Sequence, residues 1–108
     1  MGVARLSPLE QQILPRFIDA ARDILRERLV RVVLFGSRAR GDSDEDSDVD
    51  LLVLTRGHTS EQERAVIDAA TLLSLESDLL LSPLVREEEW LQSDAPIVRE
   101  IHREGVPL

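Results

Sequence analysis

Two aspartates separated by a single residue form the first feature of this sequence that could do chemistry. Asp48 and Asp50 flank Val49 at the start of the apolar run 49–54. Because side chains two apart on a β-strand point to the same face, the two carboxylates should lie close together. Like charges this close repel each other unless a positive charge lies between them, and a divalent cation with oxygen ligands supplies that charge. The spacing therefore predicts a metal site.

A solvated acidic loop is the alternative interpretation, since runs of charge usually lie in solvent. We expect the upstream acids to be loop residues rather than ligands: Asp42, Asp44, Glu45 and Asp46. Asp50 differs from them because it sits between Val49 and Leu51 in an otherwise apolar segment. An unpaired buried carboxylate there would cost several kcal/mol, so Asp50 favours a functional role.

A glycine–serine pair follows the apolar, β-branched run 29–35, which predicts a buried strand. Gly36 lets another group approach the backbone closely, and Ser37 could cap a short helix through Arg40. Free N–H groups at a helix start, together with a hydroxyl, favour phosphate binding. A phosphate cradle beside two metal-binding carboxylates is what metal-assisted phosphoryl or nucleotidyl transfer requires.

The composition excludes several other chemistries. The chain has 108 residues, no cysteine and no lysine, so thiolate metal sites, cysteine nucleophiles, Schiff bases and the lysine-dependent P-loop are absent. An EF-hand loop starting at Asp42 fails because its sixth and twelfth positions are Ser47 and Val53. His58 and His102 lack partners at metal-ligand spacing and are expected to be ordinary surface residues.

Net charge and hydropathy bear on partners and location. The net charge of -8 does not fit a general nucleic-acid binder, because such proteins are usually basic. No apolar stretch approaches the roughly 20 residues of a membrane span, and the N-terminus lacks a signal-peptide core. We therefore expect a cytoplasmic protein with no membrane partner and no general nucleic-acid binding.

The elements that must position these residues follow from periodicity and capping signals. Ser7 and Glu10 form a capping box for a first helix, in which Pro15 predicts a kink or break near Leu14. A capping box at 60–63 starts a second helix, and a third strand is expected from Leu79, with Pro83 marking its edge or end. Residues 87–92 should form a helical turn, and 93–96 should cap a last helix that ends at Gly105. We expect Phe17 and Trp90 to be core residues.

This pattern predicts an α+β fold, with two layers of α and β structure, in which a small mixed β-sheet is flanked by helices. The length predicts a single domain over residues 1–108.

The segments L-F-G-S-R-A-R-G at 34–41 and S-D-V-D-L at 47–51 resemble the signature of the DNA-polymerase-β-like nucleotidyltransferase superfamily. Within that superfamily the chain resembles the minimal nucleotidyltransferase (MNT) group. The resemblance implies a magnesium-dependent enzyme that transfers AMP from ATP to a hydroxyl and releases pyrophosphate. It implies that Gly36 and Ser37 hold the triphosphate, while Asp48 and Asp50 coordinate two Mg²⁺ ions with the nucleotide bound.

The resemblance also implies a third carboxylate from a later strand. Asp78 is the candidate, as a catalytic metal ligand that takes the acceptor's proton, and Glu76 is the second choice. Asp78 could alternatively be a turn residue beside Ser77. Arg38 and Arg40 could pair with phosphates through their forked donors, although Arg40 could equally neutralise the acidic run.

The chain has no room for the acceptor-binding domains of larger relatives, so the acceptor should come from elsewhere. MNT proteins commonly pair with HEPN proteins as antitoxin and toxin, and transfer of AMP to a HEPN tyrosine is the proposed mechanism. This chain has no tyrosine, and its negative charge would suit a basic partner surface. Two alternatives remain open: a non-catalytic antitoxin that acts by occlusion, and an enzyme acting on a small molecule such as an aminoglycoside. A homo- or hetero-oligomer is possible under each.

Overall fold

A computed structural model describes residues 6–40 and 48–108, the Arg40 side chain excepted. The acidic residues from Asp42 to Asp46 lie outside the described residues, so the prediction that they form a loop is untested. The strands are β1 (Leu29–Phe35), β2 (Val49–Thr55), β3 (Leu81–Glu87) and β4 (Val106–Pro107). The α-helices are α1 (Pro8–Leu25), α2 (Ser37–Arg40), α3 (Ser60–Glu76) and α4 (Pro96–Glu104). Two 3₁₀ turns are η1 (Arg26–Arg28) and η2 (Glu88–Gln92).

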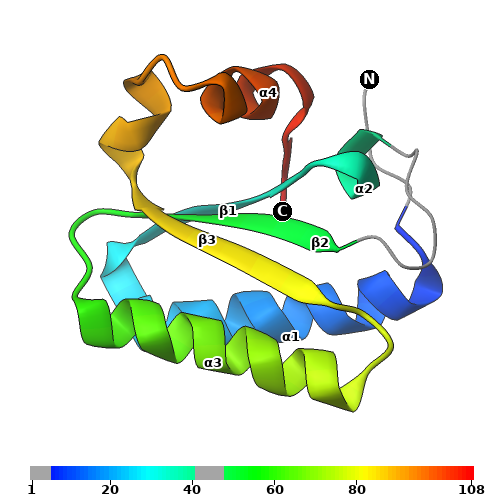
Figure 1. The fold of residues 1–108 in the computed structure, drawn as a ribbon. Coiled ribbons are helices and arrows are strands. Elements are labelled where there is room, and N and C mark those ends of the chain that lie inside the picture. Colours follow the sequence, from blue (N-terminus) through cyan, green and yellow to red (C-terminus); the bar gives the residue numbers. More distant parts are fainter. Residues whose placement is uncertain (1–5, 41–47) are drawn as a thin grey trace.

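The four described strands form one mixed sheet in the order β3-β2-β1-β4. β1 pairs antiparallel with both β2 and β4, whereas β2 and β3 run parallel and are joined through α3. Helices flank this sheet, with α1 and α3 on one face and α4 on the other (Figure 1). The predicted fold class is confirmed.

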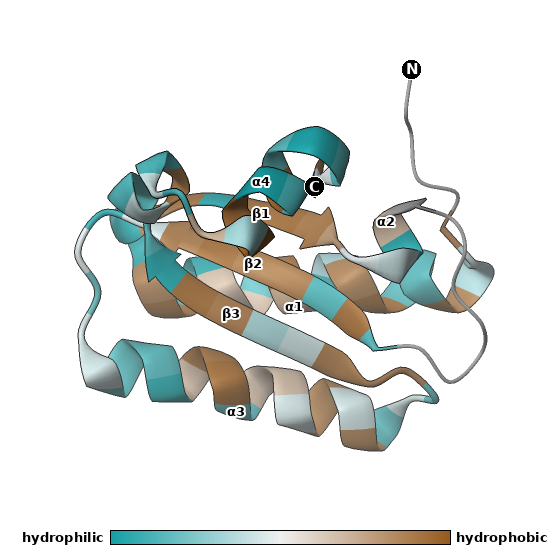
Figure 2. Ribbon diagram, turned by 45° about the horizontal axis from the view of Figure 1, so that its top comes forward, coloured by the Kyte–Doolittle hydropathy of each residue, from teal (hydrophilic) through white to brown (hydrophobic). Residues whose placement is uncertain are grey.

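Each face of the sheet buries its own apolar cluster, because neighbouring strand residues point to opposite faces. Leu34, Leu51 and Val53 pack with Phe17 and Val66 beneath the helices α1 and α3. The opposite face carries a smaller cluster under α4 and η2, comprising Val33, Phe35, Leu52, Leu54 and Ile101, with Trp90 packed against it. Figure 2 shows hydrophobic colour along much of β1 and β2 and hydrophilic colour over much of α4. Phe17 is fully buried, so its predicted core position is confirmed.

The first helix begins as predicted but has no break. Ser7 caps it: the Ser7 Oγ accepts from the Glu10 N–H at 3.1 Å, and the Glu10 Oε1 accepts from the Ser7 N–H at 2.8 Å. The expected break near Leu14 is wrong, because α1 runs unbroken through Pro15 to Leu25. Leu14 and Phe17, on either side of the exposed proline, are buried in the core, and their packing outweighs the lost backbone hydrogen bond.

Two other boundaries differ from the sequence prediction. The capping box of α3 is formed by Thr59 and Gln62, one residue before the predicted box. The third strand begins at Leu81 rather than Leu79, because the Leu81 N–H donates to the Ser74 side chain at the turn from α3. Pro83 lies inside β3, which is an edge strand, as its residue type favours.

The end of the chain also differs from the prediction. Ala95 precedes α4 with no side-chain cap, although Ser93 and Asp94 were expected to supply one. β4 was not predicted; it forms because Gly105 ends α4 and the next residues pair with β1. Among the described residues, no helix is both long enough and apolar enough to cross a membrane.

Candidate active site

The candidate site lies at the end of the sheet where β1 finishes and β2 starts. Phe35 is the β1 partner of Asp50, so Gly36 follows immediately beside that carboxylate. Gly36 has φ of 81°, a left-handed conformation that favours glycine. A β-carbon placed on Gly36 would overlap the Asp50 Oδ2 and would lie 3.3 Å from its Cγ. The turn and the carboxylate therefore fit together only because residue 36 has no side chain.

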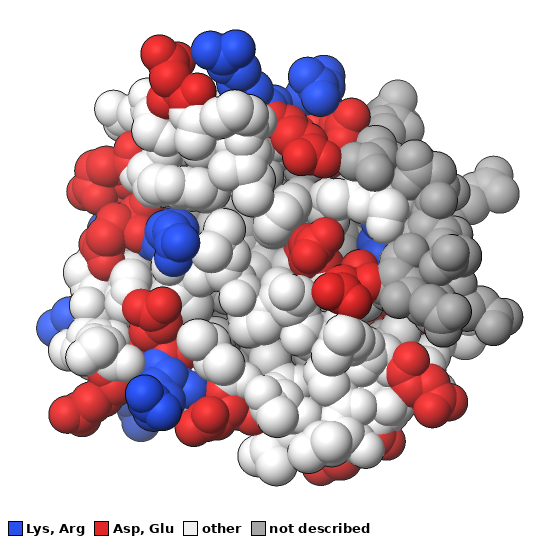
Figure 3. All heavy atoms as spheres, in the orientation of Figure 1, with Lys and Arg blue, Asp and Glu red and all other residues white. Residues whose placement is uncertain are grey.

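Asp48 lies directly before β2 and is exposed, whereas Asp50 lies within the strand and is half-buried. The intervening Val49 is fully buried on the opposite face, against α1 and α3. Strand alternation thus directs Asp50 to the face that carries α4. In Figure 3, acidic side chains lie near the middle of the molecule as viewed in Figure 1, with uncharged surface beside and below them.

The predicted short helix after the glycine is present as α2, which begins at Ser37. The Gly36 carbonyl accepts a hydrogen bond from the Ala39 N–H at 3.1 Å, which closes this turn. Ala39 packs against the core, so α2 is held to the sheet. Ser37 is half-buried, next to the turn that faces Asp50.

Arg38 turns toward the first helix. Its Nη1 lies 3.5 Å from the Glu10 Oε2, and their side chains are 10% and 5% exposed. Sequence reasoning treated Glu10 only as a capping residue. The capping motif gave no signal of this second role, because it does not indicate which distant residue the carboxylate will meet. The Arg40 side chain lies outside the described residues, so its predicted role is untested.

Asp78, the predicted third carboxylate, lies in an exposed bend between α3 and β3. Because β2 and β3 are parallel and Val49 pairs with Leu81, both strands begin at the same end of the sheet. Asp78 is therefore at the Asp48 end, but Ser82 is the β3 partner of Asp50. The alternative, Glu76, forms an exposed ion pair with Arg16 at 2.9 Å.

The donor set suits a hard cation that is shared with a substrate. Among the residues that the structure describes, no cluster of three or more metal-ligating side chains occurs. Asp48 and Asp50 supply oxygen donors only, and Mg²⁺ is commonly held by one or two carboxylates together with substrate phosphates. A magnesium ion that arrives with a nucleotide fits these residues better than a metal held by protein ligands alone.

A second polar cluster lies at the other end of β2. The buried Thr55 donates to the Glu87 Oε2 at 3.1 Å, and the His58 Nδ1 lies 2.7 Å from the same oxygen. The backbone N–H groups of Gly57 and His58 hold the pKa of the Glu87 carboxyl below its ordinary value. His58 is therefore not the ordinary surface residue that was predicted, because pairing of β2 with β3 brings Glu87 beside it.

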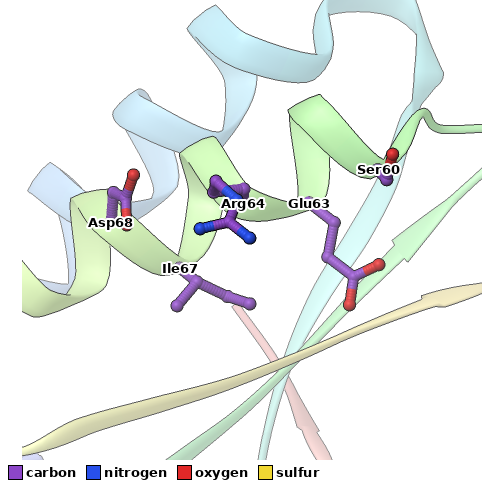
Figure 4. Close-up of a pocket in the computed structure, with 5 residues that line it drawn as sticks. All are labelled: Ser60, Glu63, Arg64, Ile67 and Asp68. Atoms are coloured by element: carbon purple, nitrogen blue, oxygen red, sulfur yellow. The ribbon is translucent and has the colours of Figure 1, made fainter.

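A shallow hollow lies along α3, lined by Ser60, Glu63, Arg64, Ile67 and Asp68 (Figure 4). Its five residues all come from a single helix face, and none is a candidate site residue. This hollow is separate from the Gly36–Asp50 site.

The fold and the site together define a class of protein. A glycine–serine turn meets the Asp50 carboxylate where β1 pairs with β2, and Asp48 lies one residue before β2. The nucleotidyltransferase domain model matches residues 16–106, and the chain belongs to this family.

Individual relatives agree with this assignment. A Methanocaldococcus jannaschii protein named "putative protein adenylyltransferase" is 43% identical over 98 residues, covering 90% of this chain and 96% of its own. A solved structure described as a "putative minimal nucleotidyltransferase" has a TM-score of 0.61 at 29% identity, covering 91% and 94% of the two chains. The fold also matches a tri-AMPylated Shewanella oneidensis HEPN toxin in complex with MNT antitoxin, with a TM-score of 0.59, 20% identity and coverage of 91% and 70%.

Proposed function

We propose that this chain is a magnesium-dependent adenylyltransferase that moves AMP from ATP to a tyrosine hydroxyl of a HEPN-family partner protein and so acts as its antitoxin. The observation that carries the proposal is the close approach of Gly36 to Asp50. This contact holds the glycine–serine turn, to which we assign the phosphates, beside a carboxylate that can bind their counter-ion.

Each residue has a proposed role. The N–H groups of the Gly36–Ser37 turn and the Ser37 hydroxyl hold the triphosphate, and Arg40 pairs with a phosphate oxygen. Asp48 and Asp50 hold Mg²⁺, which, when bound, neutralises phosphate charge and lowers the pKa of the acceptor hydroxyl. Arg38, whose Nη1 lies 3.5 Å from the Glu10 Oε2, is the second residue after Gly36, and pairing of its guanidinium with a phosphate stays a prediction.

The reaction replaces the α,β-phosphoanhydride bond of ATP with a phosphodiester bond to the acceptor. The acceptor oxygen bonds to the α-phosphorus of ATP, the bond from that phosphorus to the bridging oxygen breaks, and pyrophosphate leaves. The acceptor proton passes to a carboxylate, for which Asp78 is our candidate. Asp78 is exposed at the correct end of the sheet, which makes it accessible to an incoming acceptor.

The assignment of the acceptor rests on relatives and on composition. The 43% identical relative is named for adenylyl transfer to protein, and the Shewanella oneidensis complex is that of a tri-AMPylated HEPN toxin with MNT antitoxin. This chain has no tyrosine, so a tyrosine acceptor has to come from another molecule. The net charge of -8 suits a basic surface on that partner.

The direct test combines this protein, Mg²⁺ and ATP labelled at the α-phosphate with a candidate HEPN-family partner protein. We expect label on a partner tyrosine, and no label when that tyrosine is changed to phenylalanine. Asp48→Asn and Asp50→Asn should each abolish labelling. Asp94→Asn, an exposed acid before α4, is the matched control and should label normally.

Other outcomes would identify the alternatives. A tight complex without any label on the partner would favour an antitoxin that acts by occlusion. Label on an aminoglycoside and none on protein would favour a small-molecule substrate. Either result would overturn the proposed protein adenylylation.

A further inference from the structure

A buried ion pair connects the start of α1 to the turn that faces Asp50. The Arg38 Nη1 and the Glu10 Oε2 are 3.5 Å apart, and both side chains are about nine-tenths or more buried. The pair between Arg16 and Glu76 also joins distant segments, but those two side chains are more than half exposed. The Glu10–Arg38 pair is therefore shielded from solvent screening, and its geometry is constrained by the surrounding core.

The Glu10 carboxylate has contacts in two directions. Its Oε1 accepts from the Ser7 N–H at 2.8 Å and closes the capping box of α1. Its Oε2 faces Arg38, the second residue after Gly36. The Glu10 side chain thus links the start of α1 to the segment that follows Gly36, which we propose binds the triphosphate.

Stability alone gives a weak reason for this arrangement. A buried ion pair loses most of its Coulombic gain to desolvation and is often no more stabilising than an apolar pair of similar size. A role in holding the Gly36–Ser37 turn in position explains the buried pair better. Binding sites lose affinity when the residues that orient their binding groups are removed.

We propose that Glu10 is a positioning residue for nucleotide binding: through Arg38 it fixes the Gly36–Ser37 turn opposite Asp50. This inference rests on the proposed nucleotidyl transfer. Its consequence is that a residue of the first helix, with no assigned contact to substrate, controls affinity for the triphosphate.

Glu10→Gln is the informative substitution. A glutamine at this position can still accept from the Ser7 N–H, so the capping box is retained while the charge facing Arg38 is removed. The probe is α,β-methylene-ATP with Mg²⁺, because this analogue cannot release pyrophosphate. We expect its dissociation constant, measured by titration calorimetry, to rise about tenfold or more, in the range seen for lost supporting contacts. Asp19→Asn, which breaks the exposed pair with Arg22 on the same helix, should leave the dissociation constant unchanged.

The binding stoichiometry separates positioning from stability. If Glu10 only stabilises the fold, its loss lowers the fraction of protein that binds while the folded remainder keeps the wild-type dissociation constant. If Glu10 positions the turn, the stoichiometry stays at the wild-type value and the dissociation constant rises. Circular dichroism at the same temperature reports the folded fraction.

The outcomes also separate this inference from the proposed function. Wild-type protein that binds no Mg²⁺–nucleotide would overturn the proposed function. Wild-type binding with equal dissociation constants for Glu10→Gln and Asp19→Asn would overturn the positioning role alone. If Glu10→Gln does not fold, the double variant Glu10→Gln/Arg38→Met removes both buried charges, and a wild-type dissociation constant in that variant would equally overturn the proposal.

Discussion

Gly36 and Asp50 meet so closely that a single added carbon on Gly36 would overlap the Asp50 carboxylate. The two residues come from the end of one strand and the start of its antiparallel neighbour, where Phe35 pairs with Asp50. The two residues are 14 positions apart in the chain, and the pairing register of β1 with β2 brings them together. The space that glycine leaves is filled by the Asp50 carboxylate, so this contact requires glycine at position 36.

Gly36→Ala should destabilise the protein and abolish nucleotide binding. The left-handed backbone at φ 81° costs about 1–3 kcal/mol for a non-glycine residue, and displacement of Asp50 adds to that cost. Gly57→Ala is the matched control: its φ is 74°, but its added carbon would meet only the Arg28 Nη1 at an ordinary 3.8 Å. Urea denaturation should show a larger loss for Gly36→Ala. Equal losses, with binding retained in both variants, would contradict the predicted clash.

Magnesium and ATP together should raise the melting temperature. A ligand that binds only the folded state at one hundred times its dissociation constant stabilises it by about 2.7 kcal/mol, or roughly 10 °C for a domain of this size. Thermal scanning should show this rise with both ligands and should lose it when EDTA removes the metal. Asp50→Asn should fold but show no rise, and an undiminished rise in that variant would exclude Asp50 as a metal ligand.

Asp78→Asn should slow AMP transfer by about 10²-fold or more, because a general base typically contributes 10²–10⁴ to the rate. The dissociation constant for α,β-methylene-ATP should change less than the rate, since the proposed role concerns the acceptor proton. Asp94→Asn again serves as the exposed control. A normal rate for Asp78→Asn would show that Asp78 is only a turn residue. Another group would then accept the acceptor's proton.

Glu87→Gln should lower thermal stability near neutral pH, and the difference from wild type should shrink in acid. The Gly57 and His58 N–H groups lower the pKa of Glu87 in the folded protein from its ordinary 4.5. The carboxylate therefore contributes stability above that ordinary pKa, and the contribution is lost as the pH falls through the lowered folded value. Melting curves of both proteins from pH 7 to pH 3 would check this. A stability difference that grows in acid would contradict the assignment.

Local signals were sufficient for much of the fold. The β-branched run 29–35 and the apolar run 49–54 predicted both central strands, because buried apolar strands have a distinctive composition. The Ser7–Glu10 box gave the start of α1, since capping depends on neighbours in sequence. Pro15 predicted a kink or break, but the helix is unbroken there. The cost of the backbone hydrogen bond lost at the proline is outweighed by core packing on both sides of it.

What the sequence by itself determined is the chemistry available: a glycine–serine turn, two alternating aspartates, and no lysine, cysteine or tyrosine. Only the tertiary structure decided which groups meet. The Glu10–Arg38 pair and the Thr55–His58–Glu87 cluster both join residues about 30 positions apart, and no local pattern indicates either pairing. The physical reason is that helix packing and strand register bring such groups together, and both depend on contacts across the whole core rather than on neighbours in the chain.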